Sequence, residues 1–199
     1  MKELWEKRYA EVEYAYGTEG NAFLIEKLSH LKPGKILFVC EGEGRNAVYA
    51  ALAGWEVEAF DLSEEGKKKA LKLADEKRVK MNYQVENALH VNYEPESFEV
   101  VVLVYAHFPA EIREKIHKKA ITWLKPNGKI ILEAFNPLQL NNSSGGPKEP
   151  TMLYTKEMMQ NDFEGMKFEQ LSEEKTVLNE GKYHIGNADV TRVVAIKPE

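Results

Sequence analysis

The sequence predicts an α/β protein with a doubly wound, mostly parallel sheet, and two observations support this. From residue 35 onward, short apolar runs alternate with segments of helical spacing, and this order favours parallel strands joined by right-handed crossovers. The first run, at 35–40, is continuously apolar after its lysine, as expected for a strand covered on both faces. At 199 residues, 43% of them hydrophobic, the chain is long enough for one well-buried core. We therefore expect a single domain over residues 1–199, in which an N-terminal helical region at 1–30 precedes the sheet-forming core at 35–199.

The expected elements follow from hydrophobic spacing and from flanking residues. The predicted strands cover 35–40, 56–60, 82–85, 98–104 and 129–135, and two further strands cover about 166–174 and 190–197. The predicted helices cover 45–53, 63–78, 109–123 and about 155–163. Gly54 suits the end of the first of these helices, Ser63 suits the N-cap of the second, and Pro109 suits the first turn of the third.

Three polar segments lie between or within these elements. Residues 125–128 have proline second and glycine fourth, which predicts a type I turn. Residues 136–150 predict a structureless loop, and loops of that length in a compact domain are usually functional or mobile. The lysine run at 67–69 follows two glutamates at helical spacing, which predicts a solvated face whose charges pair with one another.

The overall charge bears on the classes of partner. A net charge of −5 gives no global basic field for phosphate backbones, so we expect no nucleic-acid partner. No apolar stretch has the length of a spanning helix or of a signal peptide, so we expect no membrane association. The single cysteine, Cys40, excludes an internal disulfide and fits a cytoplasmic location. Its place at the end of an apolar strand favours a core thiol over a nucleophile.

The turn after the first strand carries the clearest chemical signal. Gly42 and Gly44 permit a tight turn and let a ligand approach the bare backbone. The helix that begins near Arg45 directs free N–H groups to the same place, which favours a carboxylate or a phosphate there. Asp61 lies at the end of the second strand, nineteen positions after Gly42, where one carboxylate can accept hydrogen bonds from two ribose hydroxyls. This combination predicts an adenosyl cofactor.

The glycine turn alone does not separate NAD from S-adenosylmethionine, because Gly42, Gly44 and Ala47 also satisfy a dinucleotide pattern. The run Glu41-Gly-Glu-Gly-Arg-Asn-Ala-Val48, together with Phe60-Asp-Leu-Ser63, resembles motifs of class I S-adenosylmethionine-dependent methyltransferases. The likeness is strongest to the branch related to the tellurite-resistance methyltransferase. The further segments that agree in order are Trp5-x-x-Arg8-Tyr9, Tyr14-Ala-Tyr-Gly17, Tyr105-Ala-His-Phe-Pro109, Leu124-Lys-Pro-Asn-Gly128 and Glu133-Ala-Phe135.

The resemblance implies a seven-stranded Rossmann-like sheet with an antiparallel C-terminal strand pair, and it implies roles for individual residues. The implied cofactor-binding residues are Tyr9, Tyr16, Glu41, Gly42, Gly44, Asp61, Leu62, Asn87, Ala88, Tyr105 and His107. The two glycines would pass the methionine part and Asp61 would hold the ribose. Leu62 and Asn87-Ala88 would contact the adenine, and Tyr105 to His107 would lie near the sulfonium. Phe38 and Cys40 depart from the family pattern, and Glu41 is expected to take over part of the polar role.

Several residues allow two interpretations. The N-terminal aromatic residues either form a lid over the cofactor or simply pack, since Leu4, Tyr9 and Val12 suit one face of a short helix. His107 is either a catalytic proton acceptor or a hydrogen-bonded pocket histidine. Glu133, Asn136 and Tyr154 either touch substrate or are structural. The histidines and Cys40 lack metal-ligand spacing, so no metal is expected.

The predicted activity is transfer of a methyl group from S-adenosylmethionine to a small-molecule acceptor that the sequence does not identify, by a monomer or homodimer. Methyl transfer relies on positioning, so the lack of a catalytic triad is compatible with an enzyme. Two other functions stay open on the sequence: an NAD-dependent oxidoreductase and a non-catalytic protein that binds an adenosyl ligand.

Overall fold

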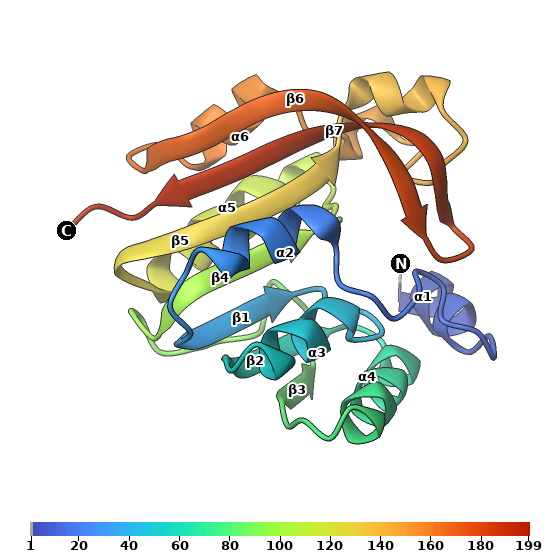
Figure 1. Ribbon diagram of the computed structural model, residues 1–199. Helices are drawn as coiled ribbons and strands as arrows, with labels where there is room; N and C mark the ends of the chain where they lie inside the picture. Colours follow the sequence, from blue (N-terminus) through green and yellow to red (C-terminus); the bar gives the residue numbers. More distant parts are fainter. Residues whose placement is uncertain (1) are drawn as a thin grey trace. The chain divides into compact units, whose positions relative to one another are not determined.

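The computed structural model describes residues 2–199 and contains a seven-stranded sheet of order β3-β2-β1-β4-β5-β7-β6 (Figure 1). The strands are β1 Lys35–Val39, β2 Glu56–Asp61, β3 Asn82–Val85, β4 Phe98–Val104, β5 Leu124–Phe135, β6 Lys167–Glu180 and β7 His184–Ile196. The β1–β2, β2–β3 and β4–β5 pairs are parallel, whereas β5–β7 is antiparallel. The predicted fold class is confirmed.

Contacts within the chain define two compact units, and each is described by itself. The first unit comprises the residues up to 91 together with 180–183, and the second comprises 92–179 and 184–199. The helices of the first unit are α1 Lys2–Tyr9, α2 Ala22–Ser29, α3 Arg45–Leu52 and α4 Glu64–Glu76. The helices of the second unit are α5 Ala110–Trp123 and α6 Lys156–Asp162, with short 3-10 helices η1 Pro137–Asn141 and η2 Pro150–Met152.

In the first unit, α4 forms where its capping residues and its apolar face predict. The Ser63 hydroxyl accepts a hydrogen bond from the Gly66 N–H at 3.0 Å, which confirms Ser63 as N-cap. Leu73 and Ala74 are buried against Val48 of α3. The lysine run is only partly solvated. Lys68 pairs with Glu65, three residues earlier rather than the four that the spacing predicts, and Lys69 instead forms a partly buried ion pair with Glu43 at 2.8 Å.

Gly44 lets α3 and α4 approach closely. Its φ of +87° lies in the left-handed region, and a Cβ atom there would lie 2.6 Å from the Ala70 Cβ. Both conditions require glycine, because an L side chain is strained at this φ and real Cβ atoms do not approach so closely. The glycine therefore serves helix packing as well as the turn.

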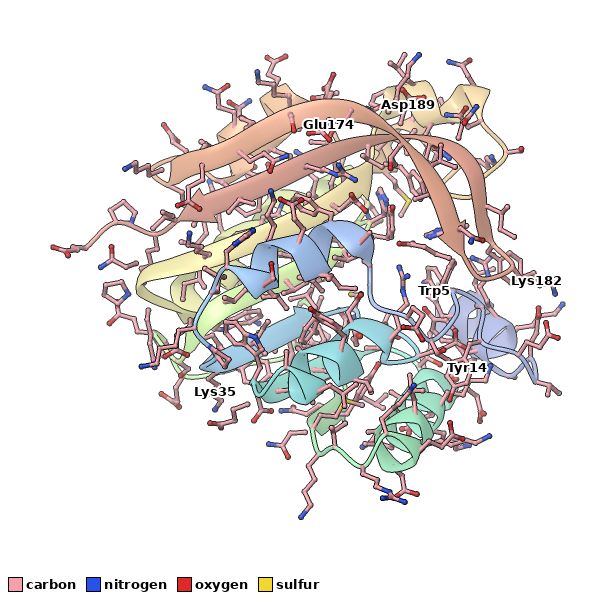
Figure 2. All side chains as sticks on the ribbon, in the orientation of Figure 1. Trp5, Tyr14, Lys35, Glu174, Lys182 and Asp189 are labelled. Carbon is pink, nitrogen blue, oxygen red and sulfur yellow. The ribbon has the colours of Figure 1, made fainter. Side chains whose placement is uncertain are left out.

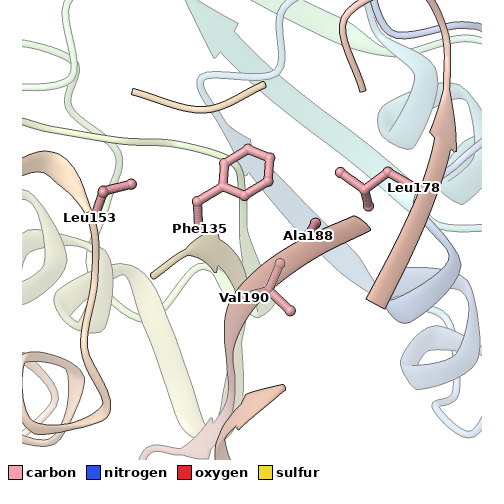
Figure 3. Packing of buried hydrophobic residues seen from close by; sticks show 5 residues of the cluster. All are labelled: Phe135, Leu153, Leu178, Ala188 and Val190. Carbon is pink, nitrogen blue, oxygen red and sulfur yellow. The ribbon is translucent and has the colours of Figure 1, made fainter. Parts of the chain in front are cut away.

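In the second unit, a cluster of apolar residues joins β5, β6, β7 and the segment before α6 (Figure 3). The cluster consists of Phe135, Leu153, Leu178, Ala188 and Val190, each at most 5% exposed. Tyr105, which follows β4, packs against it. The cluster thus fixes the ends of three strands near the segment that follows β4.

The prediction for the start of β5 was wrong. The strand begins at Leu124 rather than 129 and includes the predicted turn. Asn127 has a φ of +64°, whereas a type I turn needs about −90° at that position. Its N–H donates to the Lys197 carbonyl at 2.9 Å, and the Lys197 N–H donates to the Gly128 carbonyl at 2.9 Å. Pairing with the C-terminal strand therefore overrides the local turn preference.

Residues 136–150 are not structureless, which corrects a second prediction. The Asn136 side chain caps η1 by accepting from the Leu138 N–H at 2.9 Å. Gln139 is buried, donates to the Ser144 hydroxyl at 2.9 Å and accepts from the Asp189 N–H at 2.9 Å. Buried polar groups need such partners, and these tie the segment to β7.

The two C-terminal strands are longer than predicted. β6 extends to Glu180 and β7 begins at His184, so they form one long hairpin (Figure 1). In the second half of β6 only Leu178 is buried, so the strand carries a weak hydrophobic signal. Within residues 2–199, no helix combines the length and apolar character needed to cross a membrane.

We expect the substitution Gly44→Ala to lower the free energy of unfolding by about 3 kcal/mol, because left-handed strain and overpacking add. Gly165→Ala is the matched control, since Gly165 has a φ of +85° but a Cβ atom there would meet nothing within 4 Å. The control should lose only about 1 kcal/mol. Urea denaturation of both variants measures the difference, and equal losses would contradict the packing role of Gly44.

Candidate functional site

The turn between β1 and α3 in the first unit is built from backbone in the left-handed region. Cys40, Gly42 and Gly44 have φ values of +55°, +64° and +87°. The Gly42 N–H donates to Asp61 Oδ2 at 3.1 Å, and the Tyr83 hydroxyl donates to the Gly42 carbonyl at 2.6 Å. The turn is therefore held by a side chain from the end of β2 and by one from β3.

Asp61 links this turn to the start of α4. Its Oδ1 accepts from the Ser63 N–H at 3.0 Å, and the residue is 6% exposed. Burial raises the pKa of Asp61 to about 6, although N–H donors from Ser63, Gly42 and Leu62 favour the charged form. A carboxylate offers about four acceptor positions, so these three N–H donors leave capacity for a further hydrogen bond.

Glu41 places a second carboxylate at the start of α3. Its Oε1 accepts from the Ala47 N–H at 2.7 Å, and burial raises its pKa to about 7. One of the N–H groups expected to be free for a ligand is therefore occupied by the chain itself. Among residues 2–199, neither Glu41 nor Asp61 forms an ion pair, so both carboxylates depend on backbone donors.

Tyr9 covers the bare backbone that was expected to admit a ligand. A Cβ atom on Gly42 would lie 2.6 Å from the Tyr9 hydroxyl oxygen, and one on Gly66 would lie 3.1 Å from the Tyr9 ring. Tyr9 is 5% exposed and stacks on Trp5 with ring centroids 5.4 Å apart. The open space predicted in front of Gly42 is thus filled by an aromatic ring from α1.

The alternative that Leu4, Tyr9 and Val12 pack on one helix face was wrong for two of the three. Leu4 is 55% exposed although it lies in α1, and Val12 is 97% exposed because α1 ends before it, at Tyr9. Trp5 lies within α1 and stacks on Tyr9, whereas Tyr14 follows the helix and its hydroxyl donates to the Lys69 carbonyl at 3.1 Å (Figure 2). These aromatic side chains therefore do not form an ordinary amphipathic face.

Tyr16 belongs to a network that includes the hairpin tip at 180–183. The Arg8 guanidinium donates to the Tyr16 hydroxyl at 2.8 Å and lies 4.5 Å from the Tyr183 ring centroid. Arg45 pairs with Glu180 at 2.8 Å. Sequence reasoning missed Glu180, because 135 residues separate it from Arg45 and no local pattern marks it.

The predicted adenine-contacting residues lie on the segments that follow β2 and β3. Leu62 directly follows Asp61 and is half-buried. The Asn87 side chain accepts from the Leu89 N–H at 2.9 Å, and Ala88 is 6% exposed. Both segments belong to the first unit, as do the glycine turn and Asp61.

In the second unit, Tyr105 is in a strained conformation. Its φ is +53°, which is uncommon for an aromatic residue, and its hydroxyl donates to Glu133 Oε1 at 2.8 Å. The ring stacks on Phe135 with centroids 4.6 Å apart. Glu133 also accepts from Arg192 at 2.6 Å, so the Tyr105 hydroxyl is fixed by a charged pair.

His107 has a partner at each ring nitrogen. Nδ1 lies 2.6 Å from the Met152 carbonyl, and the Phe135 N–H donates to Nε2 at 3.2 Å. A carbonyl only accepts, so Nδ1 carries the proton and Nε2 is the acceptor. Burial lowers the pKa of His107 to about 4, which keeps the ring neutral at pH 7. This arrangement favours the hydrogen-bonded alternative over the proton acceptor.

Asn136 and Tyr154, which the sequence left with two interpretations, form hydrogen bonds with backbone groups of the chain. Asn136 caps η1 and donates to the Val190 carbonyl at 3.2 Å. The Tyr154 hydroxyl accepts from the Phe108 N–H at 2.7 Å and donates to the Ala106 carbonyl at 3.1 Å.

No group of three or more His, Cys, Asp or Glu side chains in the part of the chain described could hold a metal ion. Burial raises the pKa of the Cys40 thiol, which disfavours the thiolate.

Comparison with protein families gives a match to part of the chain. Residues 36–128 match a family model described as a methyltransferase domain. The matched segment includes the glycine turn, Asp61 and the residues that follow β3 and β4. A comparison with curated protein sequences gives no match.

Solved structures share the fold over nearly the whole chain. A protein studied for conversion of a disulfide bond into a thioacetal group during echinomycin biosynthesis has 17% identity, covers 100% of this chain and 92% of its own, and has a TM-score of 0.80. TehB from Haemophilus influenzae has 15% identity over 98% of this chain and 66% of its own, with a TM-score of 0.73. A phosphoethanolamine N-methyltransferase from Haemonchus contortus, in complex with phosphomonomethylethanolamine and S-adenosylhomocysteine, has 18% identity over 100% of this chain and 57% of its own, with a TM-score of 0.70. At these identities the likeness establishes the fold.

We expect Glu41→Gln to stabilise the ligand-free protein increasingly as the pH rises. A carboxyl whose pKa is higher in the folded state contributes stability below its unfolded pKa and loses it as the pH rises through the folded pKa. For Glu41 that window runs from 4.5 to about 7. The variant should therefore gain about 3 kcal/mol relative to wild type between pH 4 and pH 8.

Chemical denaturation at several pH values measures this gain, and Glu3→Gln is the control because Glu3 is an exposed residue of α1. Parallel stability curves for wild type and Glu41→Gln would contradict the raised pKa of Glu41.

Proposed function

We propose that this chain is a class I S-adenosylmethionine-dependent methyltransferase, and we propose its cofactor-binding residues and the class of its acceptor. The methyltransferase-domain match over residues 36–128 supports the enzyme class, and the S-adenosylhomocysteine in the structure of the Haemonchus contortus relative supports the cofactor. The observation that carries the residue assignment is the hydrogen bond from the Gly42 N–H to Asp61. It brings the glycine turn and the acidic end of β2 together, as an adenosyl ligand on an open α/β sheet requires.

Asp61 is the proposed ribose ligand. Its carboxylate lies at the carboxyl end of β2 and keeps acceptor capacity after receiving the Gly42 and Ser63 N–H groups. Leu62 and the Asn87-Ala88 pair follow the carboxyl ends of neighbouring strands, which supports adenine contacts from both. Tyr9 and Tyr16 are proposed to cover the bound cofactor.

Glu41 is the proposed partner of the positively charged methionine end. The Glu41 carboxylate accepts from the Ala47 N–H at the start of α3. The start of this helix therefore offers a negative charge, whereas a helix terminus without such a carboxylate would offer a partial positive charge. An ammonium group is the complement of that charge. Gly42 and Gly44 supply the turn that places Glu41 there.

Tyr105 and His107 are proposed from the resemblance alone as residues near the sulfonium. The fixed Tyr105 hydroxyl and the two partners of His107 support positioning roles. When bound, the cofactor supplies an electrophilic methyl group whose bond to sulfur breaks as the acceptor attacks, and the thioether departs neutral. The residues of the chain then have to orient the reactants and exclude water, which can contribute roughly 7–11 kcal/mol in favourable cases.

The proposed acceptor is a small molecule, and the proposed unit of function is one domain over residues 1–199. The net charge of −5 disfavours nucleic acid, and the structural relative from Haemonchus contortus contains a small phosphorylated amine. We propose a cytoplasmic protein that acts as a monomer or homodimer without a membrane partner.

We expect S-adenosylmethionine and S-adenosylhomocysteine to bind in the micromolar range, about −8 kcal/mol, while NAD gives no measurable heat. Asp61→Ala should weaken S-adenosylhomocysteine binding about a hundredfold, because charge-assisted hydrogen bonds to the ribose are lost. The same variant should also lower stability, since Asp61 accepts two backbone N–H groups.

Calorimetry and thermal melting on one preparation separate these effects, because affinity is measured for the folded fraction. Asp61→Asn should lose less affinity than the alanine variant. Unchanged affinity in Asp61→Ala would remove this residue from the proposed site, and tighter binding of NAD would contradict the cofactor assignment.

We expect a screen of small thiols, amines, carboxylates and oxyanions with methyl-labelled S-adenosylmethionine to identify one class that accepts the label. Asp61→Ala should reduce labelling at low cofactor concentration, and saturating cofactor should restore part of it. Transfer to RNA or DNA in preference to every small molecule would contradict the proposed acceptor class.

A further inference from the structure

Helix α1 caps helix α4 through Glu6. One Glu6 oxygen accepts from the Ser63 hydroxyl at 2.8 Å and from the Glu65 N–H at 3.1 Å, and the other accepts from the Glu64 N–H at 3.0 Å. Ser63 in turn accepts from the Gly66 N–H, so α4 is capped twice. A carboxylate at this end of a helix satisfies unpaired donors and is stabilised by the helix dipole. These donors lower the pKa of Glu6 against the effect of burial.

Tyr9 lies three residues after Glu6, on the same side of α1. Its ring covers Gly42 and Gly66, and the Gly42 N–H donates to Asp61. The first residues of α1, Lys2, Glu3 and Leu4, are exposed. The contacts of Glu6 therefore attach α1 to the segment 61–66, which contains the proposed ribose ligand Asp61.

We propose that Glu6 is a positioning residue that holds Tyr9 over Gly42 and Asp61, and that release of its contacts with α4 sets the rate at which the cofactor enters and leaves. The inference rests on the proposed function, which places the ribose at Asp61. Asp61 is 6% exposed, and the Tyr9 ring covers Gly42, whose N–H donates to the Asp61 carboxylate. On this proposal a ribose hydroxyl reaches the carboxylate when the Tyr9 ring moves. That movement carries α1 with it and separates Glu6 from the α4 terminus.

On this proposal the Glu6 contacts seen in the structure form again when α1 closes over the bound cofactor. Weakening them therefore favours the open form in both states by the same factor. Loss of a helix cap has a typical effect of about fivefold to tenfold on such an equilibrium. Entry and exit rates should rise together by that factor, while the dissociation constant stays nearly constant.

The test uses the full chain with Glu6→Ala, Glu6→Gln and the matched control Glu3→Ala, which alters an exposed glutamate of the same helix. Stopped-flow fluorescence with S-adenosylhomocysteine reports entry and exit, since Trp5 stacks on Tyr9. Hydrogen exchange of residues 2–9 without ligand reports attachment of α1. We expect Glu6→Ala to raise both rates about fivefold to tenfold and to speed exchange at 2–9, with a dissociation constant within twofold of wild type.

Glu6→Gln keeps an acceptor oxygen but loses the charge, so it should lie between wild type and Glu6→Ala, and Glu3→Ala should match wild type. Unchanged exchange at 2–9 in Glu6→Ala overturns the attachment, and unchanged rates despite faster exchange overturn the control of cofactor entry. A weaker affinity with an unchanged entry rate also overturns it, because Glu6 would then contact the ligand. Absence of binding to wild type would refute the proposed function instead, and the exchange experiment would still decide the attachment.

Discussion

The hydrogen bond from the Gly42 N–H to the Asp61 carboxylate is the constraint on which the first unit depends. It fixes a left-handed turn against the end of β2, and the same carboxylate accepts the N–H of Ser63 at the start of α4. One side chain therefore sets where α4 begins relative to the turn that starts α3. The close approach of Gly44 to Ala70 becomes possible only in that arrangement. Asp61 is thus a structural residue before any ligand binds, and its raised pKa reflects the burial that this structural role requires.

The two buried carboxylates of the first unit share an electrostatic situation. Glu41 and Asp61 each accept backbone N–H groups, and each has a pKa raised by burial. Dipoles of N–H groups stabilise a buried charge less completely than a full positive charge does. A positively charged ligand beside them would lower both pKa values and release protons. In the ligand-free protein, burial therefore disfavours the ionised form of both carboxyls, and a cationic cofactor would favour that form again.

The sequence predicted the first four strands and the helices between them to within one or two residues, because continuous apolar runs, Ser63 and the glycines are local signals. It also placed Gly42 and Asp61 together, since the chemistry of a nucleotide site repeats at a fixed spacing. It failed where distant contacts dominate. The left-handed Asn127 is explained by pairing with Lys197, and the role of Glu6 depends on α4, 57 residues later. The second half of β6 alternates between half-buried and exposed residues and buries only Leu178, so no apolar pattern marked it.

The hairpin tip at 180–183 has a consequence for the order of synthesis. Glu180 pairs with Arg45, and the Tyr183 hydroxyl donates to Glu11 across 172 positions of sequence. Gly181 sits so close to Tyr16 and Gly17 that neither segment has its final surroundings without the other. A chain emerging from the ribosome therefore exposes the segment near residues 5–17 until the hairpin tip at 180–183 has been made. Contacts of such long range slow folding, and until they form the aromatic side chains near residues 5–16 are available to chaperones.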